Sequence, residues 1–231
     1  TVIEVEENLD ERVARRISGT FEVPLYMTDA GAPGSRLFYG ADGLPTRNGS
    51  FTADFRCIVP HAALAGPDGA TVPARPAVYG HGLLGSEREV SAGNVRSMAN
   101  EHNFVFCATK WIGMSEQDIG NAVSILGDLS RFPTLADRLQ QGMLNTLFLG
   151  RLMIHAAGLS SHPAFQGSDG RPVIDARELF YDGNSQGGIM GGAVTAIAID
   201  WTRAVLGVPG MNYSILLHRS VDWDTYAAIY H

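Results

Sequence analysis

A single serine stands between glycines where an apolar run ends and a helical pattern begins. The motif is GNSQG (183–187), and the run before it is ELFYDG (178–183). A serine hydroxyl becomes a nucleophile when a base takes its proton and the backbone holds its oxygen clear. A sharp G-x-S-x-G turn does the second of these, and it needs small neighbours because strand and helix come close together. The pattern predicts Ser185 as a nucleophile and the amide of Gln186, at the helix N-terminus, as a donor to an oxyanion.

The residues around the serine form the predicted elbow. Gly183 and Asn184 precede Ser185, and Gly187 follows it by two residues. The pattern is short, and the chain contains 27 glycines. From this motif alone, a glycine-rich helix entry without a catalytic role stays the alternative.

A second glycine-rich motif lies about a hundred residues upstream. The stretch YGHGLLGS (79–86) ends an apolar run and precedes a helical pattern. A turn of this kind supplies a second backbone donor to an oxyanion. Its position favours the amide of Leu83, with Gly82 as the alternative donor. The two motifs in this order make an accidental match to G-x-S-x-G much less plausible.

Strand patterns alternate with helical patterns along most of the chain, which predicts an α/β fold with a mostly parallel sheet flanked by helices. Residues 1–17 are charged and are expected to form an edge segment or a short helix. The predicted strands are 19–27, 49–60, 75–82, 103–111, 178–183 and 203–210. The predicted helices are 86–102, 116–130, 135–158 and 186–200.

Two helix starts show capping-box spacing, Ser115 with Asp118 and Thr134 with Asp137. In the long helix that follows the second of these, apolar residues recur at i, i+4 spacing, which predicts that this face packs on the core. These residues are Leu135, Leu139, Met143, Leu147 and Phe148.

The sequence resembles the α/β-hydrolase superfamily, in its serine-nucleophile esterase and lipase branch, from about residue 19 to about residue 210. The run from ATKWIGMSEQD to LADRLQQGMLN also resembles a group of large bacterial hydrolases. The resemblance implies that the strands near 49–60, 75–80, 103–109, 178–182 and 203–209 are the second to the sixth of that fold. It also implies a core over 1–210 and the start of a cap insertion over 211–231.

The resemblance implies roles for further residues. His81 would orient the turn that holds the oxyanion donors. Trp111 and Met114 follow the fourth strand of the family, and Tyr213 opens the expected cap, so these three are candidates for contact with a substrate. Each of them would equally well cover the sheet.

The base and the acid of a Ser-Asp-His triad are expected after the sixth strand, in the order Ser, acid, His. Asp222 or Asp224 followed by His231 has that order, but no strands lie between them to return them to Ser185. The last strands of the fold are likewise missing from the sequence. We therefore expect a C-terminal part of the same polypeptide, or a partner chain, to supply both residues and to cover the sheet edge.

The expected activity is hydrolysis of a carboxylic ester through an acyl-enzyme on Ser185. Amide or thioester cleavage and acyl transfer would use the same residues. The alternative is a catalytically inactive hydrolase-fold binding module or an inert fragment. A nucleotide-binding α/β domain is disfavoured because residues 29–35 lack G-x-G-x-x-G.

Composition limits the partners. A formal net charge of −7 and a pI near 5.4 argue against nucleic acid. No apolar run is long enough to span a membrane. Two cysteines without a CxxC motif argue against a metal site, and no cofactor is implied. The expected ligand is a small-molecule or lipid-like ester.

Cys57 and Cys107 are either two buried thiols or one disulfide. The resemblance implies that they lie on neighbouring strands, which leaves a bridge open. A bridge would favour a secreted or periplasmic protein.

Overall fold

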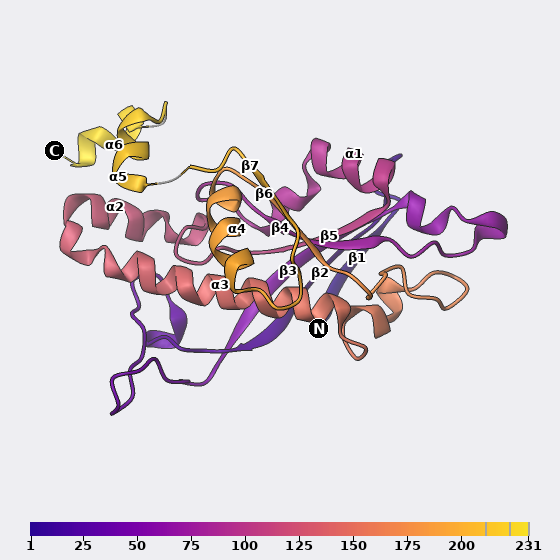
Figure 1. The fold of residues 1–231 in the computed structure, drawn as a ribbon, viewed down its shortest axis with the longest axis horizontal. Coiled ribbons are helices and arrows are strands. Elements are labelled where there is room, and N and C mark those ends of the chain that lie inside the picture. The colour runs from indigo at the N-terminus through magenta and orange to yellow at the C-terminus, as the bar shows by residue number, and fades with distance from the viewer. Residues whose placement is uncertain (211, 222, 231) are drawn as a thin grey trace.

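Seven strands form one sheet in the computed structural model, which describes residues 1–210, 212–221 and 223–230 (Figure 1). All six predicted strands are present, and residues 1–17, expected to form an edge segment or a short helix, contain an edge strand and the first residues of the next strand. The strands are β1 (Val2–Glu7), β2 (Val13–Pro24), β3 (Ser50–Pro60), β4 (Arg75–Gly80), β5 (Phe104–Thr109), β6 (Phe180–Asn184) and β7 (Ala204–Gly207).

The strand order across the sheet is β1-β2-β3-β5-β4-β6-β7. Strands β5, β4, β6 and β7 pair in parallel, whereas β1, β2 and β3 join them through antiparallel pairing. Because β2 runs in the direction of the four parallel strands, the predicted mostly parallel α/β sheet is confirmed. Strand β3 lies beside β5, as the resemblance implied for the second and fourth strands of the fold. The regular elements described after β7 are helices.

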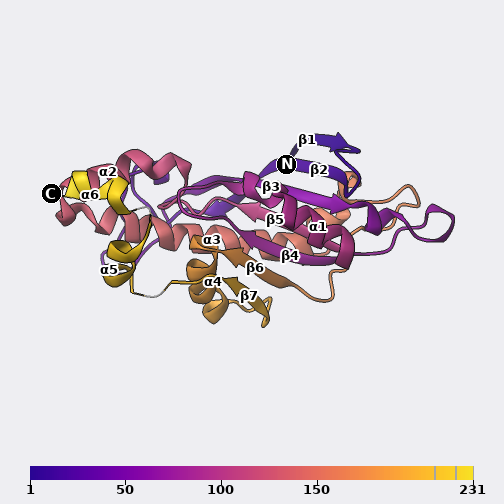
Figure 2. The ribbon, with the colours of Figure 1, turned by 90° about the horizontal axis from the view of Figure 1, so that it is seen from above.

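Helices cover both faces of the sheet (Figures 1 and 2). On one face Val95 and Ala99 of α1 pack on Ala77 and Phe106, and α3 and α4 pack on the other face. Beyond the sheet, α6 packs against α2. Within the ranges that the structure describes, no helix has the length and apolar character needed to cross a membrane. The helices are α1 (Gly93–His102), α2 (Ile119–Gly127), α3 (Pro133–Ile154), α4 (Gln186–Ile197), α5 (Tyr213–Leu216) and α6 (Trp223–Tyr230).

The apolar face predicted for the long helix α3 packs on the core in part. Leu139, Met143 and Leu147 are partly buried and pack against the core, whereas Phe148 is exposed. The fully buried face consists mainly of small and polar residues, and at Gly142 the helix closely approaches the backbone of the loop after β5. A Cβ on Gly142 would lie 2.9 Å from the carbonyl oxygen of Ile112. The buried residues of α3 are Asp137, Arg138, Gln141, Gly142, Asn145, Thr146, Leu149, Gly150 and Met153.

Of the two predicted capping boxes, the structure contains the first. The Ser115 and Asp118 side chains each bond the other's backbone amide at the start of a short 3-10 turn that leads into α2. The second prediction is wrong, since α3 already begins at Pro133 with no side-chain cap. The Asp137 carboxylate instead accepts hydrogen bonds from the Arg36 side chain and the Leu37 amide.

The two cysteines form a disulfide that joins β3 to β5. Cys57 and Cys107 stand directly opposite each other in the antiparallel ladder, with their Cα atoms 4.1 Å apart. Both side chains are fully buried in the core on the α3 face of the sheet. The bridge therefore resolves the alternative that the sequence left open between two thiols and one disulfide.

Candidate active site

Ser185 occupies a strained turn between β6 and α4. Its backbone has φ 56° and ψ −118°, a conformation that a non-glycine residue adopts only when its surroundings enforce it. The Ser185 amide donates to the carbonyl of Gly207 on β7 at 2.9 Å. The Ser185 side chain is exposed to solvent. A serine presented in this way at the N-terminus of a helix is what a G-x-S-x-G turn requires.

The glycines of the turn are needed because β4, β6 and α4 meet there. Gly80 on β4 pairs with Gly183 on β6, and a Cβ on Gly187 would lie 2.1 Å from the Gly80 carbonyl oxygen. The Tyr181 hydroxyl donates to the Gly187 carbonyl at 2.5 Å and so ties β6 to the first turn of α4. Any side chain at position 187 would force the helix away from the sheet and displace Ser185.

The turn after β4 presents one of its two predicted donors. The Gly82 amide donates to the Glu89 carboxylate at 2.8 Å, so the alternative donor Gly82 is already occupied. The Gly82 carbonyl accepts from the Gly85 amide at 3.2 Å. Among the described residues the Leu83 amide has no hydrogen-bond acceptor, and the Leu83 side chain is 42% exposed. Of the two donors predicted in this turn, Leu83 is therefore the one whose amide is available to a ligand.

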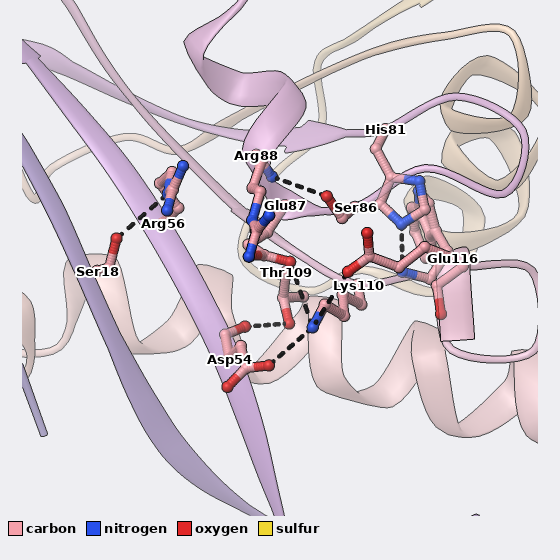
Figure 3. A network of polar contacts seen from close by, with 12 residues as sticks. Ser18, Asp54, Arg56, His81, Ser86, Glu87, Arg88, Thr109, Lys110 and Glu116 are labelled. Atoms are coloured by element: carbon pink, nitrogen blue, oxygen red, sulfur yellow. Dashed lines mark hydrogen bonds and ion pairs between the residues drawn. The ribbon is translucent and has the colours of Figure 1, made fainter. Parts of the chain in front are cut away.

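The His81 ring connects the turn after β4 to the loop after β5 (Figure 3). Its Nε2 accepts a hydrogen bond from the Trp111 amide at 2.8 Å, so Nδ1 carries the proton and donates to the Gly82 carbonyl at 2.8 Å. The ring is fully buried. Burial lowers the pKa of His81 below its ordinary value, although the bond to Gly82 opposes this shift. A neutral imidazole with both nitrogens engaged is not available as a general base.

Lys110 lies beside His81, among three carboxylates (Figure 3). Its Nζ is 2.9 Å from Asp54 Oδ2 and 3.7 Å from carboxylate oxygens of Glu87 and Glu116. Burial alone would lower the pKa of Lys110, but the bond to Asp54 and the charges of Glu87 and Glu116 outweigh burial and raise it. Lys110 is thus a charged structural residue and not a base.

Two of the three predicted substrate-contact residues are inside the protein. Trp111 is 1% exposed and Met114 is 6% exposed, and Trp111 belongs to the core on the α3 face. Side chains with so little accessible surface do not line an open pocket. Their burial therefore does not support the prediction that they contact a substrate. The side chain of Tyr213 lies outside the described part of the structure.

The remaining histidines of the described residues are not hydrogen-bonded to Ser185. His61 bonds the Asp10 carbonyl, and the rings of His155 and His162 each accept from a nearby backbone amide. Asp222 and His231, the acid and base considered from the sequence, lie outside the described residues. The five histidines other than His81 in the described ranges are His61, His102, His155, His162 and His218.

A buried ion pair that sequence reasoning missed supports the loop after β5. The Asp118 carboxylate accepts from the Gly113 amide at 2.9 Å and from the Ser115 amide at 3.0 Å, and it pairs with the Arg138 guanidinium. Both side chains of the pair are almost completely buried, at 0% and 2% exposure. The loop carries the Trp111 amide that holds His81, so this pair supports the turn that contains Leu83. The capping-box spacing identified Asp118, but no local signal identified its partner.

Asp182 is a second titratable residue that the sequence did not single out. It lies on β6 and pairs with Tyr79 and Val205 in the neighbouring strands. Burial raises the pKa of Asp182, and the hydrogen bond from Gly183 only partly opposes the shift. Since its pKa is higher in the folded than in the unfolded chain, the folded chain binds more protons between the two values. The contribution of Asp182 to stability therefore falls as the pH rises through this range.

We expect Asp182→Asn to raise the free energy of unfolding at pH 7, because it removes a partly buried charge and keeps an acceptor for Gly183. Below pH ~3, where most of the carboxyl is protonated even in the unfolded chain, the variant and the parent should be equally stable. Urea unfolding at the two pH values measures this difference. Glu178→Gln is the control, because it removes a charge from an exposed position close to the same strand. A gain of equal size at both pH values would contradict the prediction.

Comparison with known proteins supports no closer assignment than the fold. No protein-family model matches the chain, and no curated protein sequence matches it. Solved structures similar to the chain include acetyl xylan esterase 1 from Thermoanaerobacterium sp. JW/SL YS485 (TM-score 0.49, 16% identity, 97% of this chain and 59% of that one). A glucuronoyl esterase from Solibacter usitatus (TM-score 0.39, 14% identity, 91% and 51%) is another.

An S-formylglutathione hydrolase from Agrobacterium tumefaciens is also similar (TM-score 0.42, 12% identity, 84% of this chain and 56% of that one). The chain spans between one half and three fifths of the length of these three structures. The activities in their names belong to those proteins. The strand order of this chain and the turn at Ser185 match the fold that its sequence resembles. The chain therefore has an α/β-hydrolase fold.

Proposed function

We propose that the chain carries the nucleophile and the oxyanion hole of a serine hydrolase that cleaves carboxylic esters. The observation that carries the proposal is the strained, exposed Ser185 between β6 and the N-terminus of α4. Backbone strain of this kind persists where the surrounding structure enforces it, and it concentrates at functional sites. The Leu83 amide, which has no acceptor among the described residues, is the second observation in favour.

In the proposed reaction, the Ser185 hydroxyl attacks the ester carbonyl and transfers its proton to a histidine base. The carbonyl oxygen becomes an oxyanion that accepts hydrogen bonds from the Gln186 and Leu83 amides. Collapse of this intermediate expels the alcohol, which takes the proton from the histidine, and leaves an acyl group on Ser185. Water, activated by the same histidine, then releases the acid.

We further propose that the base and the acid come from residues outside this chain, on the same polypeptide or on a partner chain. His81 and Lys110, considered above as bases, are both committed to other contacts. No described histidine is bonded to Ser185. Such a segment would also cover the exposed apolar residues of β7, Val205 and Leu206.

The proposed substrate is a small-molecule or lipid-like ester without a required charge. The Leu83 side chain, which is apolar and partly exposed, supports this choice. The disulfide between Cys57 and Cys107 supports a secreted or periplasmic location, because such bridges form and persist in oxidising compartments.

The test is labelling with a fluorophosphonate, followed by intact-mass analysis and sequencing of the modified peptide. We expect a single adduct on Ser185 in the polypeptide that contains the base. The probe reacts only with an activated serine, so the adduct reports both the nucleophile and its base.

Folded protein that stays unlabelled at Ser185 would contradict the proposal and favour a catalytically inactive binding module of the same fold. An adduct on a different serine would place the active site elsewhere. Circular dichroism of the same sample distinguishes both results from a failure to fold.

A further inference from the structure

We propose that Glu89 is a positioning residue of the oxyanion turn, which binds the Gly82 amide so that the turn presents Leu83 as its donor. This inference rests on the proposed function of Ser185. Glu89 lies in a short 3-10 helix, η4 (Glu87–Ser91), that directly follows the turn. Its carboxylate accepts from the Gly82 amide at 2.8 Å.

The contact of Glu89 departs from the one that its sequence position favours. Ser86 to Glu89 reads S-x-x-E, a capping-box pattern in which the Glu side chain bonds the amide of the capping serine. The Ser86 hydroxyl does accept from the Arg88 amide, at 3.4 Å. The Glu89 carboxylate, however, reaches back past Ser86 to Gly82. A local helix cap therefore does not account for Glu89.

The carboxylate of Glu89 lies inside the turn. A Cβ on Gly85 would lie 1.9 Å from Glu89 Oε1, and a Cβ on Gly82 would lie 3.5 Å from Oε2. The turn thus wraps around the carboxylate, and a side chain at position 85 would displace it. Within the described residues Glu89 forms no ion pair, and its carboxylate bonds the Gly82 amide of the turn.

The surrounding contacts leave Gly82 with no free polar group. Its amide is bound by Glu89, and its carbonyl accepts from the His81 ring and from the Gly85 amide. The Gly82 carbonyl and the Leu83 amide belong to the same peptide unit. Because hydrogen bonds accepted by the carbonyl polarise that unit, they strengthen the Leu83 amide as a donor. The hydrogen bonds to the Gly82 amide and the Gly82 carbonyl also fix the direction in which the Leu83 N–H points.

The register of the sheet places this turn next to the nucleophile. Gly80 on β4 pairs with Gly183 on β6 in a parallel ladder. Both strands therefore end at the same edge, with Leu83 three residues beyond Gly80 and Ser185 two residues beyond Gly183. A shift of the turn alters the distance between the donor and the oxyanion, and misplacement of a catalytic group by 1 Å lowers a rate about 100-fold.

The test compares Glu89→Ala, Glu89→Gln and the control Glu101→Ala in the complete polypeptide. Glu101 is an exposed carboxylate on the neighbouring helix α1. We expect Glu89→Ala to lower kcat roughly 10- to 100-fold with little change in KM, because the oxyanion forms only in the transition state. Glu89→Gln should keep most of the rate, since its amide oxygen accepts the same bond. Glu101→Ala should match the parent.

The rate is expressed per fluorophosphonate-titrated Ser185, so that a loss of folded protein does not count as a loss of kcat. An unchanged kcat per titrated site in Glu89→Ala, or a rise in KM alone, would overturn the proposal.

A second measurement does not depend on activity. In a ¹⁵N-¹H spectrum, the Gly82 amide proton should move upfield in Glu89→Ala and stay near its parent position in Glu89→Gln. An unmoved Gly82 resonance would overturn the proposal even in a protein without esterase activity. The parent could neither hydrolyse esters nor react with the probe while the Gly82 resonance shifts as expected. In that case the proposed function fails and the contact of Glu89 with Gly82 is structural only. That result would overturn the positioning role of Glu89.

Discussion

Replacement of Ser185 by alanine should lower kcat/KM for ester hydrolysis by at least roughly 10⁴-fold, because the reaction then lacks the atom that carries the acyl group. The loss should fall on kcat, since the hydroxyl contributes little to binding of the ester. The turn should keep its shape, because the Ser185 contacts to Gly207 and Ile189 are made by the backbone. Steady-state kinetics with a p-nitrophenyl ester measure the effect.

Ser168→Ala is the matched control for this experiment. Ser168 is an exposed serine in the loop before β6, and its replacement should leave both kcat and KM unchanged. Residual hydrolysis by Ser185→Ala within tenfold of the parent would mean that another group or a contaminating enzyme does the chemistry.

Asp118→Ala should lower the free energy of unfolding by about 3–5 kcal/mol, because it leaves the buried Arg138 guanidinium without its partner. The backbone amides of Gly113 and Ser115 lose their acceptor in the same variant. Since these residues form the loop that carries Trp111, the turn held by His81 should also loosen. Urea unfolding followed by fluorescence measures the change in stability.

Two further variants separate the cost of the unpaired charge from the loss of the loop contacts. In Asp118→Ala/Arg138→Met the charge is gone, and a large part of the lost stability should return. Asp175→Ala breaks an ion pair in which the Arg177 side chain is 86% exposed, and it should cost less than about 1 kcal/mol. If Asp118→Ala is as stable as the parent, the ion pair does not support the loop.

The elbow could be predicted from sequence because its residues lie within five consecutive positions. A Cβ on Gly183 would meet the Gly187 carbonyl of the same turn, whereas the contact of Gly187 with Gly80 on β4 joins distant segments and is not visible in the motif. The α/β order followed from the alternation of apolar runs with helical patterns. The neighbourhood of Cys57 and Cys107 followed from the strand order that the resemblance implied.

The contacts that the sequence did not reveal are of two kinds. Some join segments that lie far apart along the chain, and others involve a side chain with more than one possible partner. Arg138 lies twenty residues after Asp118, and its position on a helix gives no sign that it is buried. Glu89 has a capping role open to it one turn away and binds Gly82 instead. On α3, the periodicity of the leucines predicted residues that pack against the core, but it did not reveal the close approach of Gly142 to Ile112.

The disulfide between Cys57 and Cys107 makes the intervening chain a closed covalent ring with a sequence separation of 50. Strand β4, the turn at Leu83 and the carboxylate of Glu89 all lie within that ring, whereas Ser185 lies outside it. A single peptide bond broken inside the ring leaves the protein in one covalent piece until a reductant opens the bridge. The Leu83 turn and Ser185 are thus held together by the pairing of β4 with β6. Only the Leu83 turn lies within the covalent ring that the disulfide closes.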